Sequence, residues 1–88
     1  MANVPTKPPV DFSTLILSIA TSAGESFESA VAGGSEAASA LALGQHSVEL
    51  LALLEEKTVG NLSGEEERLL AQLLFDLRVK LVELTQKC

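Results

Sequence analysis

Residues 50–84 have the sequence LLALLEEKTVGNLSGEEERLLAQLLFDLRVKLVEL, in which one leucine-rich segment ends and, after a short link, another begins. The first segment stops near Gly60, since glycine readily adopts the left-handed backbone conformation that closes a helix. Ser63 and Glu66 then form the S-x-x-E pattern of a capping box. Three consecutive glutamates occupy the following turn, where the positive end of the helix dipole favours acidic side chains. The pattern predicts a helix on each side of the link.

The link between these two helices is so short that they must lie antiparallel beside each other. We therefore expect an antiparallel helical hairpin with helices at about 37–58 and 64–87. The composition agrees with an all-α fold, because Leu and Ala are strong helix formers. The aromatic residues that β-rich domains favour are scarce, with no Trp or Tyr and only three Phe.

Upstream of the hairpin the sequence predicts an additional N-terminal helix at about 12–28. Asp11 is suited to capping its start, and a Gly-Gly pair at 33–34 breaks the chain after it. Its apolar residues recur every three or four positions: Phe12, Leu15, Ile16, Ile19, Ala20, Ala23 and Phe27. Residues 1–10 contain all three prolines and predict a flexible tail, with a Pro-rich docking peptide as the alternative. Residues 11–88 are then a single helical domain.

The chain is small, and a domain of 88 residues buries only about 60–65% of the surface that its unfolded form exposes. Oligomerisation is one way in which small domains gain the missing stability. Cys88 is the one cysteine, so no disulfide can form within the chain; we expect a free thiol, with a disulfide between two chains as the alternative. A lone thiol is typical of a reducing compartment, and no secretory signal is visible, so we expect a cytoplasmic protein.

The net charge is −6, with six basic residues scattered among twelve acidic ones. Proteins that bind phosphates need clustered Lys and Arg, so we expect neither nucleic acid nor an anionic membrane as a partner. The longest uncharged stretch with helical periodicity, Phe12–Gly24, has 13 residues. A membrane-spanning helix needs about 20. The sequence therefore predicts a soluble protein.

The helix expected at 64–87 carries apolar residues on two opposite sides. One stripe has the alternating four- and three-residue spacing of a coiled-coil seam: Leu70, Leu74, Leu77, Leu81 and Leu84. The other stripe consists of Ala71, Phe75, Val79 and Val82. The helix expected at 37–58 shows the same doubling, with Leu43, Leu50, Leu53 and Leu54 on one side and Leu41, Gly44, Val48, Leu51 and Ala52 on the other. A two-helix hairpin buries only one stripe per helix.

The second stripes need another cover, because each large apolar side chain left in water forgoes roughly 1.5–3 kcal/mol. A second copy of the chain can provide it, so we expect a helical-bundle homo-oligomer, most simply a two-fold dimer. The predicted oligomer interface consists of Leu70, Leu74, Phe75, Leu77, Val79, Leu81, Val82 and Leu84. The alternative is a three-helix monomer in which the first helix fills the groove.

The sequence offers no catalytic residues. Acid–base catalysis needs a desolvated carboxylate, whereas the paired glutamates lie at helix ends or in polar runs. His46 is the one histidine, so a Ser–His–Asp arrangement cannot be assembled. His46 and Glu49 share a helix side, but no second pair accompanies them as di-metal bundles require. We therefore expect no enzyme, no cofactor and no metal.

Lys57 and Asn61 flank the link between the last two helices. Exposed polar residues on a rigid turn can bind a partner, so these two are the candidate residues for binding another protein. We favour the structural interpretation of the two residues, in which Lys57 and Gly60 end the helix and Asn61 shapes the turn.

Several of these segments resemble a known family: DFSTLILS at 11–18, LLALLEEKTVGNLS at 50–63, EERLL at 66–70 and LLFDLR at 73–78. They are similar to small bacterial proteins of unknown function, the domain of unknown function 1844 (DUF1844). The resemblance implies a helical, cytoplasmic bacterial protein and brings neither catalytic residues nor a known activity. With the apolar stripes, it leads us to expect a non-enzymatic oligomerisation and protein-interaction module. A helical bundle that binds a metal through carboxylates, or a small ligand, is the alternative.

Overall fold

A computed structural model describes residues 10–86, and this part of the chain forms three α-helices and no strand. They are α1 (Phe12–Ala32), α2 (Ala37–Lys57) and α3 (Gly64–Gln86). The prediction of an all-α fold is confirmed. Of the predicted tail only Val10 is described, and it is exposed; residues 1–9 and 87–88 lie outside the described residues.

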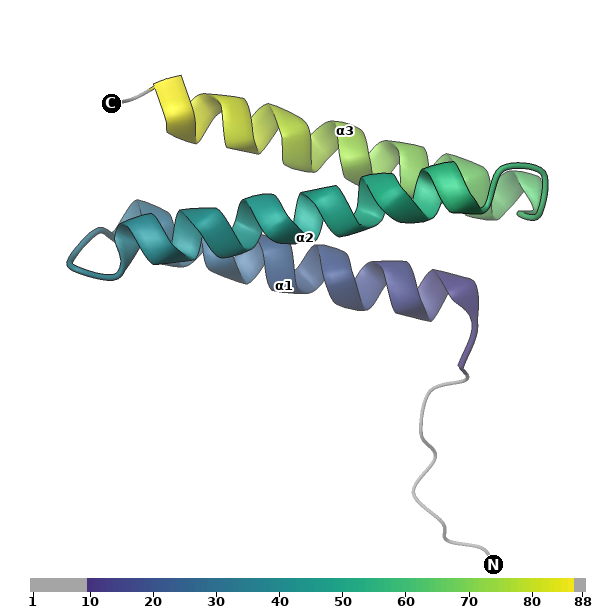
Figure 1. Cartoon of the computed structure of the whole chain (residues 1–88), viewed down its shortest axis with the longest axis horizontal. Helices are drawn as coiled ribbons and strands as arrows, with labels where there is room; N and C mark the ends of the chain where they lie inside the picture. Colours follow the sequence, from purple (N-terminus) through teal and green to yellow (C-terminus); the bar gives the residue numbers. More distant parts are fainter. Residues whose placement is uncertain (1–9, 87–88) are drawn as a thin grey trace, which may run out of the picture.

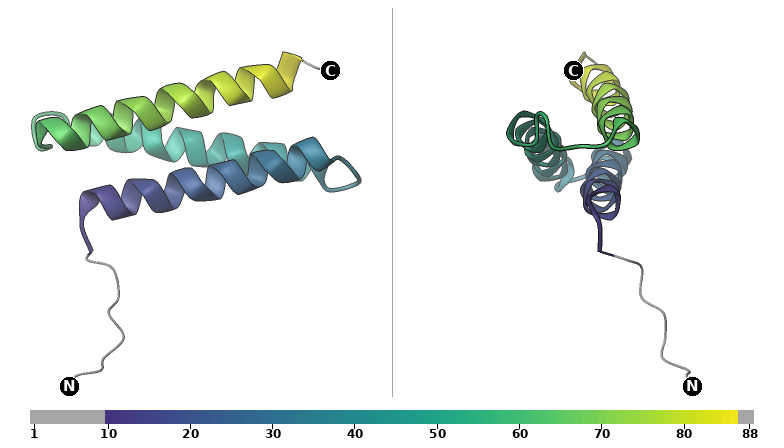
Figure 2. Two further views of the ribbon diagram at one scale, coloured as in Figure 1. Left: turned by 180° about the vertical axis from the view of Figure 1, so that it is seen from behind. Right: turned by 90° about the vertical axis from the view of Figure 1, so that its right-hand side faces the viewer.

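Successive helices run in opposite directions, and the end-on view of Figure 2 places them at the corners of a triangle (Figures 1 and 2). Each helix contacts both of the others, and α1 and α2 pack most extensively. Toward its C-terminal end α3 diverges from α2 (Figure 1). Both views therefore show α1 packed into the bundle beside α2 and α3.

Hydrogen bonds at the helix ends follow the sequence signals. The Asp11 carboxylate accepts a 2.8 Å bond from the Thr14 N–H and caps α1. At α3, the Glu66 N–H donates to the Ser63 hydroxyl at 3.1 Å while the Ser63 N–H donates to the Glu66 carboxylate at 2.9 Å. This reciprocal pair is the predicted capping box, which satisfies two amides that a helix start leaves without partners.

Helix α1 extends four residues beyond its predicted end at 28. Gly24 lies inside it, because a glycine weakens a helix without breaking it. The helix stops at Gly33, whose φ of 82° turns the chain away and whose N–H bonds to the Ala30 carbonyl. Helix α2 instead ends at Lys57 with Thr58 as its cap, whose N–H bonds to the Leu54 carbonyl. Gly60, which was predicted to close this helix, follows in the link with a φ of 84°.

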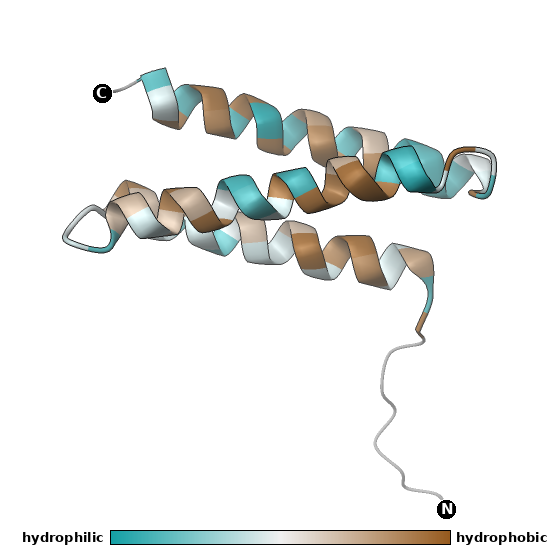
Figure 3. Ribbon diagram, viewed as in Figure 1, coloured by the Kyte–Doolittle hydropathy of each residue, from teal (hydrophilic) through white to brown (hydrophobic). Residues whose placement is uncertain are grey.

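The core lies where the three helices meet. Its largest buried side chains come from all three: Ile16 and Phe27 from α1, Leu51 from α2, Leu70 and Leu74 from α3. Within residues 10–86, eight hydrophobic residues are buried, while eleven large hydrophobic residues are exposed. Apolar residues accordingly recur along all three ribbons (Figure 3). The interior is thus small relative to the apolar surface that remains outside.

Helix α2 turns one of its two predicted stripes inward. Gly44, Val48 and Leu51 are buried, whereas Leu43 and Leu53 are exposed on the other side. Gly44, the smallest of them, lies against Phe27 and suits the close packing of α2 on α1.

By length and composition alone α2 could cross a membrane, since its most apolar 18-residue window has a mean hydropathy of 1.3 and is 22% buried. From the sequence, only the uncharged stretch Phe12–Gly24, which lies in α1, was considered as a membrane span, and the apolar character of α2 was not identified. An exposed Glu49 lies near the middle of α2, and ionisable residues at that depth of a membrane are costly.

Candidate interaction surface

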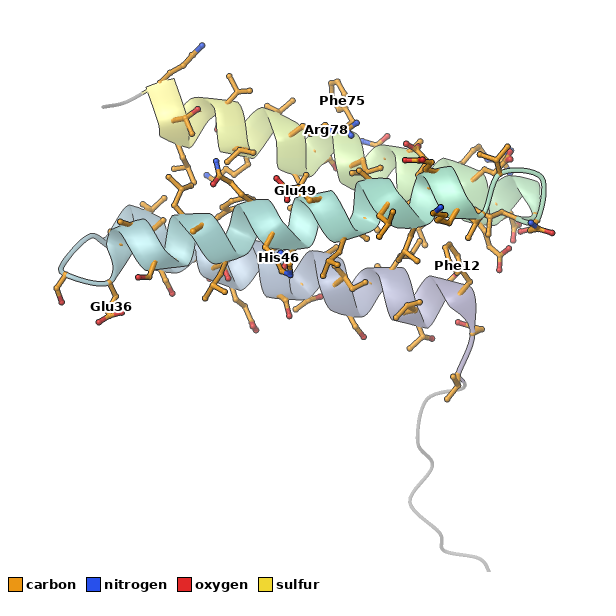
Figure 4. All side chains as sticks on the ribbon, in the orientation of Figure 1. Phe12, Glu36, His46, Glu49, Phe75 and Arg78 are labelled. Carbon is orange, nitrogen blue, oxygen red and sulfur yellow. The ribbon has the colours of Figure 1, made fainter. Side chains whose placement is uncertain are left out.

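The outer side of α3 exposes three large apolar residues. Phe75, Val79 and Val82 are 64%, 43% and 50% exposed. Their spacing of four and three residues places them along one side of the helix. Figure 4 shows the Phe75 ring pointing away from α1 and α2. We call these three residues the outer stripe.

The predicted oligomer interface is divided by the fold into an inner and an outer group. The outer group is the outer stripe. The inner group faces the chain's own core, with the first two residues 1% exposed and the other three half-buried against it: Leu70, Leu74, Leu77, Leu81 and Leu84. The reason is that α1 packs against this side of α3. These five leucines therefore pack within the chain, and α1 leaves the outer stripe uncovered.

A groove of about 560 Å³ runs along the outer stripe and is open to solvent on one side. Its lining is mainly apolar and comes almost entirely from α3: Glu55, Ala71, Leu74, Phe75, Arg78, Val79, Val82 and Glu83. Glu55 is the contribution of α2, and with Arg78 and Glu83 it brings charge to an otherwise apolar surface. Arg78 has no ion-pair partner among residues 10–86. The groove is an apolar strip edged by charges.

The two predicted partner-binding residues lie at the end of α2 and in the turn that follows it, and both are exposed. The Asn61 N–H donates to the Thr58 carbonyl at 2.9 Å, and its side-chain amide donates to the Val59 carbonyl at 3.5 Å. Lys57 is the last residue of α2, where its charge complements the helix dipole. The bonds of Asn61 shape the turn, and binding of another protein by Lys57 and Asn61 stays a prediction.

His46 and Glu49 are exposed on α2 (Figure 4). Between Val10 and Gln86, no three His, Cys, Asp or Glu residues come close enough to hold a metal ion. No polar or charged side chain in this range is buried, so desolvation does not prepare any of its carboxylates for acid–base catalysis. The pKa of Asp11 is lowered, first by the bond from the Thr14 backbone N–H and then by one from the Thr14 side chain. This shift belongs to a helix cap.

The sequence identified the outer stripe, but it did not identify the groove beside it, because Glu55 comes from the neighbouring helix. The sequence did contain one indication of the groove, the opposite charges of Arg78 and Glu83 on the two sides of the stripe. The predicted interface included neither residue.

Comparison with known proteins gives one match. The sequence matches the family described as Domain of unknown function (DUF1844) over residues 9–83, which is most of its length. No curated protein and no solved structure matches the chain significantly. The match includes α1, α2 and all of α3 except its last three residues, so the groove lies within the shared region. The chain belongs to the DUF1844 family.

Proposed function

We propose that this chain is a non-enzymatic helical module that associates with itself through the outer side of α3. The observation that carries the proposal is the outer stripe, three large apolar side chains left in water at helical spacing. Full burial of a large apolar side chain contributes roughly 1.5–3 kcal/mol, and covering the exposed half of each of these contributes a corresponding part of that. Contiguous exposed apolar surface is typical of a protein interface.

A second protein chain suits the groove better than a small molecule. Its volume of about 560 Å³ is in the range of ligand sites. Such sites, however, enclose most of their ligand's surface, whereas this groove is open along one side. A long, shallow apolar strip on a helix is suited to another helix.

The proposal also covers the setting in which the module acts. We place it in the cytoplasm, without nucleic acid or membrane as partners, and without a cofactor. The net charge of −6 supports this part, because both DNA and anionic lipid repel an acidic protein. The alternative function is a bundle that binds a metal through carboxylates. It predicts stoichiometric iron, manganese or zinc in the purified protein, which elemental analysis would detect.

Size-exclusion chromatography with light scattering tests self-association. We expect twice the chain mass of 9.2 kDa at micromolar concentrations, and the monomer mass for Phe75→Glu. Leu43→Glu is the matched control, because Leu43 is 60% exposed but lies on α2 outside the groove. Circular dichroism confirms that both variants fold. A native chain that stays monomeric, or a Phe75→Glu variant that still dimerises like the control, contradicts the proposal.

A further inference from the structure

The outer stripe has charges of opposite sign on its two sides. At 100° per residue, Arg78 lies about 60° to one side of Phe75, and Glu83 lies about 80° to the other. Both side chains are exposed and line the groove. Asp76 falls on the side of Glu83 and is also exposed. On α3, Arg78 therefore lies on one side of the stripe, and Glu83 and Asp76 lie on the other. Lys80 lies farther round from Asp76, and Glu55 of α2 lines the groove on the Arg78 side.

These positions have the spacing of a parallel coiled coil. With Phe75 and Val82 at d and Val79 at a of a heptad, Arg78 is at g and Glu83 is at the following e. In a parallel pair of helices, g of one helix lies beside the following e of the other. Charges at these positions determine the partner and the orientation.

The orientation of a second copy decides which edges meet. When two copies of α3 lie parallel across a two-fold axis, Arg78 of each meets Glu83 of the other. When they lie antiparallel, equal sides meet, so that Arg78 approaches Arg78 and the sides that carry Glu83 and Asp76 face each other. Like charges at an interface oppose association. The pattern favours the parallel arrangement.

We propose that a second copy of the chain binds parallel along α3, with Arg78 of each chain beside Glu83 of the other. This arrangement rests on the proposed self-association and adds its geometry. The outer stripe provides the affinity, because exposed ion pairs contribute little. The two symmetric Arg78–Glu83 pairs select the orientation.

Charge reversal tests the pairing. We expect Arg78→Glu and Glu83→Arg each to weaken the homodimer on the order of tenfold, because each brings like charges together twice. An equimolar mixture of the two variants should form a heterodimer, and the double variant should regain the native affinity. Lys80→Glu is the matched control, since it changes the net charge as Arg78→Glu does but lies outside the groove lining. Failure of both the mixture and the double variant to recover affinity overturns the pairing.

Disulfide trapping measures the orientation directly. In a Cys88→Ser background, Gln86→Cys should link to itself, and so should Gln72→Cys, because both residues are at a and equal a positions face each other in a parallel dimer. Positions 72 and 86 lie about 21 Å apart along the helix, too far for a mixed disulfide. Mixed links without self-links would establish an antiparallel dimer and overturn this inference while leaving self-association intact. A native chain that light scattering shows to be monomeric would instead overturn the proposed function.

Discussion

Gly44 on α2 lies against the aromatic ring of Phe27 on α1, and a Cβ atom at position 44 would overlap that ring. Phe27 is 1% exposed, so its ring is enclosed in the core. Among the glycines of the described chain, Gly44 is the one at which an added Cβ would come closest to a neighbouring atom. It explains why α1 and α2 pack so extensively, since glycine lets two helix backbones come together.

Gly44→Ala should therefore destabilise the fold. Alanine favours a helix by about 1 kcal/mol over glycine, but overpacking costs about 1–3 kcal/mol, and the enclosed ring makes the steric cost larger. We expect a net loss of about 1–2 kcal/mol in urea unfolding. Gly24→Ala is the control, because nothing lies within 4 Å of a Cβ there, and it should stabilise α1. In a double-mutant cycle, Gly44→Ala should cost less in a Phe27→Leu background than in the native chain, because leucine relieves the overlap. Free-energy losses that simply add would contradict the contact.

Leu51 and Leu53 give a second comparison on one helix. Leu51 is fully buried, so Leu51→Ala should cost about 2–5 kcal/mol of the free energy of unfolding. Leu53 is 48% exposed on the outward side, and Leu53→Ala should change it by no more than about 0.5 kcal/mol. Chemical denaturation measures both. Equal losses would mean that α2 is rotated relative to the orientation described here.

The capping box at α3 makes a local prediction. Ser63→Ala removes the hydroxyl that accepts the Glu66 N–H, and should cost about 1 kcal/mol. Glu66→Gln should cost less, because glutamine can replace glutamate in this motif. Ser35→Ala is the control in the other interhelical link, where α2 has no side-chain cap, and we expect no change in the melting temperature.

Asp11 predicts a pH dependence of stability. Its pKa is lowered in the folded chain by the bonds from Thr14, so the carboxylate stabilises the fold above its usual pKa of about 3.9. This contribution is lost as the pH falls through the folded value. The melting-temperature difference between the native chain and Asp11→Asn should be constant near neutral pH and should change below about pH 4. A difference that is independent of pH from 7 to 2 would show that the cap does not titrate.

The sequence was sufficient for the three helices and for most of their ends, because these depend on local signals. Asp11, Ser63 and Glu66 form the predicted caps, Gly33 ends α1, and Gly60 lies in the link after α2. The end of α1 was placed too early because Gly24 and the polar residues after it weaken a helix on average. In the structure Phe27 is buried in the core, and α1 continues past it to Ala32, where Gly33 ends the helix.

The candidate surface was predictable only in part. Helical periodicity identified two apolar stripes on α3 but could not show which one faces the core, since both are rich in large aliphatic residues. The position of α1 decides this, and it depends on packing between residues far apart in sequence, such as Phe27 with Gly44. The contribution of Glu55 to the groove was likewise not predictable, because it depends on how α2 packs beside α3.

With eight buried hydrophobic residues and eleven exposed large ones among residues 10–86, the chain leaves apolar surface that the proposed self-association would cover. A protein that covers its remaining apolar surface only by meeting a copy becomes more stable as its concentration rises, by mass action. The amount of this protein in a cell would then help to set the fraction that is folded. Dilution alone should lower its thermal midpoint.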